Sequence, residues 1–169
     1  MTNPTAAMLV IGDEILSGRT RDSNSHHLAG ELTRHGIRLM EIRMVADEEA
    51  DIVAALNALR DRWDHVFTSG GIGPTHDDIT ADAVARAFGV SIDVREDARA
   101  LLAAHYQRSG QELNAARLRM ARIPEGAALI DNPVSVAPGS TKDNVHVMAG
   151  VPNVFHATVA SLMPTLHGG

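Results

Sequence analysis

Short apolar runs alternate with amphipathic segments through the first half of the chain, and this alternation constrains the fold most. The run AAMLVI is continuously apolar, as expected for a strand that is buried on both faces of a sheet. Three such strand–helix units predict an α/β fold: a three-layer α/β/α sandwich with a mostly parallel sheet. The expected strands are residues 6–11, 37–45 and 65–69. The helices that follow them are expected over residues 23–35, 48–62 and 78–88, respectively.

The second half of the chain is less regular. Residues 91–95 fit a short strand, and helices are expected over 96–109, 112–121 and 152–162. The remainder is dense in Pro and Gly, which predicts short strands and a small β-hairpin around 141–144. No repeat or linker interrupts the sequence, so we expect a single domain over residues 1–169.

Composition excludes several functional classes. The net charge is −6 with no block of like charges, which argues against a nucleic-acid partner. The absence of cysteine rules out disulfides, thiolate metal sites and cysteine nucleophiles. No segment approaches the roughly 18 consecutive apolar residues of a membrane span, so a cytoplasmic protein without membrane association is expected.

A glycine-rich stretch, SGGIGPTHDDIT, follows the third expected strand. Ligands of open α/β sheets bind at the carboxyl ends of the strands. Gly70, Gly71 and Gly73 allow a sharp turn that exposes successive N–H groups, and these favour a phosphate. The hydroxyls of Ser69 and Thr80 flank the turn and belong to the same candidate phosphate site. The stretch matches neither the Walker pattern nor GxGxxG.

Two adjacent carboxylates, Asp77 and Asp78, stand where a phosphate would be repelled. Asp78 as the N-cap of the next helix explains one of them without any function. A divalent cation explains both, because Mg²⁺ binds one or two carboxylates together with phosphate oxygens. The pair therefore predicts a metal site, with Asp78 as the principal candidate.

Other expected strand ends also carry acidic residues. Asp13, Glu14, Asp22 and Asn24 follow the first strand, where the alternative is a surface loop whose Ser23 or Asn24 caps the next helix.

Asp47 follows the second strand, and ordinary capping of the helix after it is the alternative interpretation. Gly150 and Pro152, in a late small-residue turn, offer a second group of backbone donors.

The segments GDEILSGRTRDSN, TSGGIGPTHDDITADA and the late GVP resemble the molybdopterin-binding domain family over about residues 6–165. Within this family, the chain most resembles the N-terminal domain of competence/damage-inducible protein A (CinA). Its resemblance to MogA and MoaB is more distant. Asp at position 77 favours the CinA-like branch, since a basic residue is usual in the MogA-like one. The late turn has Ala149 where family members often have proline.

The resemblance implies a site for a pterin or nucleotide phosphate, with Asp78 and Asp47 as functional aspartates. The MogA-like branch uses Mg-ATP to adenylylate molybdopterin, and the CinA-like branch is linked to metal-dependent hydrolysis of ADP-ribose-type pyrophosphates. The resemblance also implies that the chain forms a homo-oligomer, either a dimer or a trimer. Full CinA proteins carry a C-terminal amidase domain, and no amidase activity is expected of this chain.

Three functions stay open from the sequence. The first is a molybdopterin-binding protein related to molybdenum cofactor biosynthesis, with Mg²⁺ or another divalent metal as cofactor. The second is a divalent-metal-dependent pyrophosphatase, and the third is a non-catalytic ligand-binding module.

Overall fold

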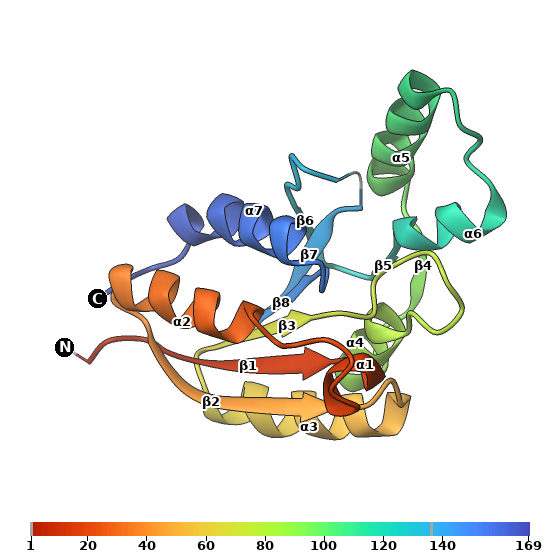
Figure 1. The fold of residues 1–169 in the computed structure, drawn as a ribbon. Helices are drawn as coiled ribbons and strands as arrows, with labels where there is room; N and C mark the ends of the chain where they lie inside the picture. The colour runs from red at the N-terminus through yellow and green to blue at the C-terminus, as the bar shows by residue number, and fades with distance from the viewer. Residues whose placement is uncertain (1, 136) are drawn as a thin grey trace.

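A six-stranded sheet forms the centre of the computed structural model, which describes residues 2–135 and 137–169 (Figure 1). Its first four strands in spatial order are parallel, and the last two form antiparallel pairs beside them. The order is β2 (Arg38–Val45), β1 (Thr5–Ile11), β3 (His65–Ser69), β8 (Val145–Met148), β7 (Gly139–Lys142) and β6 (Ala128–Ile130). The mostly parallel sheet and the hairpin, formed by β7 and β8, are confirmed.

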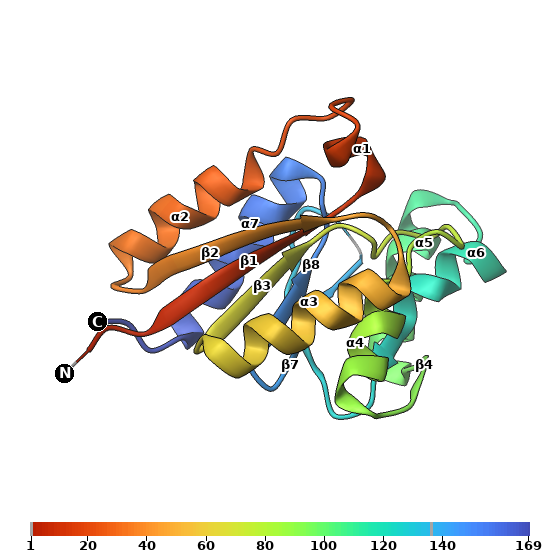
Figure 2. The same cartoon turned by 90° about the horizontal axis from the view of Figure 1, so that it is seen from below.

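Helices cover both faces of this sheet, which gives the expected three layers (Figure 2). The helices α2 (Asn24–Arg34) and α7 (Pro152–Leu162) pack on one face, and α3 (Glu49–Arg62) and α4 (Thr80–Phe88) pack on the other. Met8 of β1 faces the first core and Leu9 the second, and both are fully buried. This double burial explains why the AAMLVI run is apolar without alternation.

A smaller α/β unit lies beyond the carboxyl ends of the parallel strands (Figures 1 and 2). It is built around its own buried cluster, which includes Leu102, Tyr106 and Ile123. Its elements are β4 (Ile92–Val94), α5 (Glu96–Ser109), α6 (Ala115–Leu118), the 3₁₀-helix η1 (Arg119–Ala121) and the antiparallel partner of β4, β5 (Arg122–Pro124).

Three segments differ from the sequence prediction by more than one residue at an end. The expected helix over 112–121 is reduced to α6 and η1, because the Asn114 side chain accepts from Arg117 N–H and begins the helix late. α4 begins at Thr80 instead of Asp78. The loop expected after β1 contains a four-residue helix, α1 (Asp13–Leu16). Among the described residues, no helix is long and apolar enough to cross a bilayer.

Candidate functional site

The glycine-rich turn after β3 has the backbone conformation that its sequence predicts. Gly70 and Gly71 have φ angles of +100° and +74°, in the left-handed region that favours glycine. A Cβ on Gly70 would lie 2.1 Å from the Ile11 carbonyl oxygen, and a Cβ on Gly71 would lie 2.1 Å from Thr80 Oγ1. No other residue fits either position without moving its neighbours.

The turn presents three successive backbone donors. Within the described chain, the N–H groups of Gly71, Ile72 and Gly73 have no hydrogen-bond acceptor. The N–H of Gly70 is different, since it donates to the Met148 carbonyl at 3.1 Å. Thr80 is buried behind the turn, where its hydroxyl donates to the Gly70 carbonyl at 2.9 Å. Gly70 and Thr80 therefore shape the turn, and its donors come from residues 71–73.

A cleft of about 490 Å³ opens in front of these donors. Apolar side chains, including Ile72, Met120 and Val154, form much of its wall. The structure brings seven of the predicted site residues together in this cleft: Glu14, Gly70, Gly71, Gly73, Asp78, Gly150 and Pro152.

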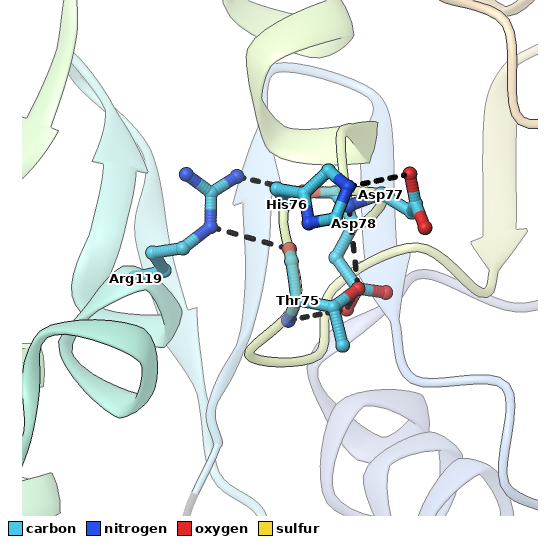
Figure 3. Close-up of polar contacts among 5 residues, drawn as sticks. All are labelled: Thr75, His76, Asp77, Asp78 and Arg119. Carbon is cyan, nitrogen blue, oxygen red and sulfur yellow. Dashed lines mark hydrogen bonds and ion pairs between the residues drawn. The ribbon is translucent and has the colours of Figure 1, made fainter.

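Asp78 lines the cleft and does not cap α4. Its carboxylate accepts hydrogen bonds from the Thr75 N–H at 2.9 Å and the Thr75 hydroxyl at 2.8 Å (Figure 3). The capping alternative for Asp78 is therefore wrong, because the side chain closes the 75–78 turn that precedes α4.

Asp77 lies in different surroundings. Its side chain is 79% exposed and faces His76, with Oδ1 3.4 Å from the imidazole Nε2. The carboxylates of Asp77 and Asp78 point in different directions (Figure 3). The structure therefore places Asp78, and not the adjacent pair, at the cleft.

Asp47 contacts the first loop instead of capping α3. Its Oδ2 accepts from Asp13 N–H at 3.1 Å, and Asp13 Oδ1 accepts from Asp47 N–H at 3.0 Å. Burial raises the pKa of Asp47, and the negative charges of Asp13, Glu14 and Asp78 add to that rise. Carboxylates from three strand ends thus lie close enough to interact.

Asp22 and Asn24 organise the loop that leads into α2. Asp22 Oδ1 accepts from the N–H groups of Asn24 and Ser25, so Asp22 caps the helix in place of Ser23 or Asn24. Asn24 Nδ2 donates to the Gly150 carbonyl at 2.9 Å, which ties this loop to the late turn. With buried Ser69, Asp22 and Asn24 line a small cavity of about 50 Å³ that adjoins the cleft and shares Glu14, Gly150 and Pro152 with it.

Sequence reasoning missed Arg119, which reaches the glycine-rich turn from the smaller α/β unit. Its Nε donates to the Thr75 carbonyl at 3.2 Å and its Nη2 to the Asp78 carbonyl at 3.4 Å (Figure 3). The only signal in the sequence was the basic run RLRMAR, of which Arg119 is the middle arginine. Arg119 thereby holds the segment that carries Asp78.

The carboxylates at the cleft could hold a divalent cation only together with oxygen atoms from a bound ligand or from water. Among residues 2–135 and 137–169, no three His, Asp or Glu side chains converge as a ready-made metal cage. Magnesium takes one or two carboxylates and completes its shell with water and phosphate oxygens. The carboxylates of Glu14 and Asp78, which line the cleft, fit that requirement.

Known proteins resemble this chain in sequence. It is 40% identical over 167 residues to a CinA-like protein of Citrifermentans bemidjiense, covering 96% of this chain and 40% of the relative. The chain spans only 59% to 65% of the archaeal relatives that it matches.

Solved structures share the fold. The CinA protein of unknown function from Thermoplasma acidophilum superposes with a TM-score of 0.87 at 33% identity, over 96% of this chain and 97% of that one. The molybdopterin biosynthesis enzyme MoaB from Thermus thermophilus superposes with a TM-score of 0.63 at 17% identity, over 96% and 91%. The model of the probable molybdopterin binding domain matches residues 7–168. The chain therefore belongs to the probable molybdopterin binding domain family, with CinA-like proteins among its relatives.

Proposed function

We propose that this chain binds molybdopterin, with the phosphate of the pterin on the glycine-rich turn. The observation that carries the proposal is the set of N–H donors of Gly71, Ile72 and Gly73 at the cleft. Such clustered donors at the carboxyl edge of a parallel sheet bind anions. The apolar wall of the cleft suits a flat heterocycle.

A divalent cation, Mg²⁺ in the first instance, is the proposed cofactor. Asp78 lines the same cleft as the donors, and burial, with the charges of Asp13, Glu14 and Asp78 adding to it, raises the pKa of Asp47. A cation between Asp78 and a ligand phosphate would neutralise both charges. Asp47 and Asp13 would then act on the bound cation from the neighbouring strand ends.

Calorimetric titration of molybdopterin into the chain, with and without Mg²⁺, tests the proposal. We expect binding that Mg²⁺ strengthens and that Asp78→Asn weakens. The matched control is Asp77→Asn, which removes the neighbouring charge but lies outside the cleft. Undetectable molybdopterin binding, with the chain folded by circular dichroism, would contradict the proposal.

Metal-dependent hydrolysis of an ADP-ribose-type pyrophosphate is the second candidate function. The carboxylates of Glu14 and Asp78 at the cleft favour it, since one or two carboxylates can hold the divalent cation that metal-assisted cleavage of a phosphoanhydride requires. Incubation with ADP-ribose and Mg²⁺ or Mn²⁺ should then release AMP. If the chain binds molybdopterin but converts neither molybdopterin nor ADP-ribose, it would instead be a non-catalytic ligand-binding module.

A further inference from the structure

Two histidines from neighbouring helices stack face to face between α2 and α7. The imidazole rings of His27 on α2 and His156 on α7 have centroids 3.7 Å apart and planes only 18° from parallel. His156 Nε2 is buried and has no hydrogen-bond partner among the described residues. The packing suits two neutral rings, because a protonated His156 would hold a buried N–H without an acceptor.

The charged groups around this histidine stack oppose a second positive charge. Burial lowers the pKa of His27 and the neighbouring His156 lowers it further, while Glu31 opposes this and Arg34 and His26 add to the lowering. The Glu31 carboxylate is itself paired with Arg34, and α7 contains no titratable side chain other than His156. Two imidazolium rings at this separation would repel each other. The stack is therefore stable when neutral and weakens as pH falls.

The two helices lie side by side with their N-terminal ends at the cleft (Figures 1 and 2). At these ends Asn24 Nδ2 donates to the Gly150 carbonyl at 2.9 Å. Gly150 also packs on Gly70, since a Cβ added to Gly150 would lie 3.2 Å from Gly70 Cα. At the opposite ends, His35 Nε2 lies 2.7 Å from the Leu166 carbonyl oxygen. The histidine stack lies between these contacts and so sets the spacing of the helix ends at the cleft.

Apolar packing keeps the two helices attached when the stack breaks. Leu28, which follows His27, and Phe155, which precedes His156, are fully buried in the same core cluster. Loss of the stack would therefore separate the N-terminal ends of α2 and α7 and leave the chain folded.

We propose that the histidine stack makes the cleft sensitive to protons. Neutral rings hold the N-terminal ends of α2 and α7 together, and protonation of both rings separates them and displaces the late turn (residues 149–152), which lines the cleft. Each proton taken up by the open form raises its ratio to the closed form by up to about ten-fold per pH unit. The opening is a property of the free chain, and its effect on affinity rests on the proposed ligand.

Titration of the free chain by NMR between pH 8 and 5 tests the proposal without a ligand. The amide resonances of Gly70 and Gly150 should shift with the same midpoint as the ring resonances of His27 and His156. Buried His146, whose pKa is about 3, stays neutral over this range and does not contribute. Amide shifts that follow neither ring of the stack would overturn the proposal.

The variant His156→Phe keeps a stacked aromatic ring but removes one of the two charges. A phenyl ring attracts a protonated His27, so the titration midpoint of His27 should rise and the titration of the Gly150 amide should disappear. The matched control is His26→Gln, which removes the exposed neighbouring histidine and should keep the native titration of Gly150. If His156→Phe does not fold by circular dichroism, His27→Phe should give the same loss. A Gly150 titration that is the same in the native chain and in the folded variant would overturn the proposal.

Calorimetric titration of molybdopterin at pH 7.5 and at pH 5.5 measures the effect on the cleft. The affinity of the native chain should fall several-fold more than that of His156→Phe, and this comparison cancels any protonation of the ligand itself. Equal losses in both chains would overturn the coupling of the stack to the cleft. Absence of binding at both pH values would contradict the proposed function alone, because the amide titration of the free chain decides the role of the stack independently.

Discussion

Asp13 and Asp47 are joined by two reciprocal hydrogen bonds, in which each carboxylate accepts from the backbone N–H of the other residue. The two residues follow neighbouring parallel strands, β1 and β2, so the bonds fix the relative position of two strand ends. Ligands of this sheet class bind at that edge. The pair is therefore structural, and it lies next to the cleft, because Asp13 directly precedes Glu14, which lines it.

Replacing Asp47 separates this structural role from a role in metal binding. Asp47→Ala leaves the Asp13 N–H without its acceptor, so the free energy of unfolding should fall by about 1 kcal/mol. Asp47→Asn retains an oxygen acceptor and should be closer to the native stability, while it removes a charge beside Asp13. Urea denaturation measures the first effect, and Mg²⁺-dependent ligand binding measures the second. If Asp47→Asn kept both the native stability and the native Mg²⁺ dependence of ligand binding, the charge of Asp47 would have no part in metal binding.

Gly71 should tolerate no side chain, for a reason that can be separated from backbone strain. Gly71→Ala places a Cβ 2.1 Å from Thr80 Oγ1 and should disrupt the Thr80–Gly70 hydrogen bond. Gly89→Ala is the matched control, because Gly89 has a similar φ of +67° and no atom within 4 Å of its added Cβ. Strain alone costs about 1 kcal/mol, so we expect the control to be mildly destabilised with native affinity. Gly71→Ala should lose ligand binding, as measured by calorimetry; equal affinities would contradict the turn's role.

The sequence predicted the fold better than the site. Each strand–helix unit has a local signal, such as the continuous apolar run of β1, from which its burial on both faces follows. Contacts over long separations have no such signal: Asp47 looks like a helix cap until the fold brings Asp13, 34 residues away, beside it. The capping alternative for Asp78 fails for a local reason, because its carboxylate bonds to Thr75, three residues earlier, and closes a turn that the sequence does not distinguish from a helix cap.

Arg119 should tune the site without touching the carboxylate of Asp78. Arg119→Ala removes the two donors to the Thr75 and Asp78 carbonyls, and the 75–78 turn should become less ordered. If the loss of these hydrogen bonds weakens the binding free energy by about 1 kcal/mol, the affinity for the ligand falls roughly five-fold. Arg99→Ala, which breaks an exposed ion pair with Glu96 on α5, is the control and should bind normally. Identical affinities for both variants would show that the turn is ordered without Arg119.

Two histidines away from the cleft should make stability depend on pH. Burial lowers the pKa of His146 to about 3 and also lowers that of His65, whose Nδ1 lies 3.0 Å from His146 Nε2. The unfolded chain binds protons below the ordinary histidine pKa of about 6.5 while folded His146 stays neutral, so stability is lost as pH falls. His146 alone should lower the free energy of unfolding by about 1.4 kcal/mol per pH unit below that value. Urea denaturation between pH 5 and 8 measures the slope, and His146→Gln should reduce it. A slope that is unchanged in His146→Gln would assign the pH dependence to other groups.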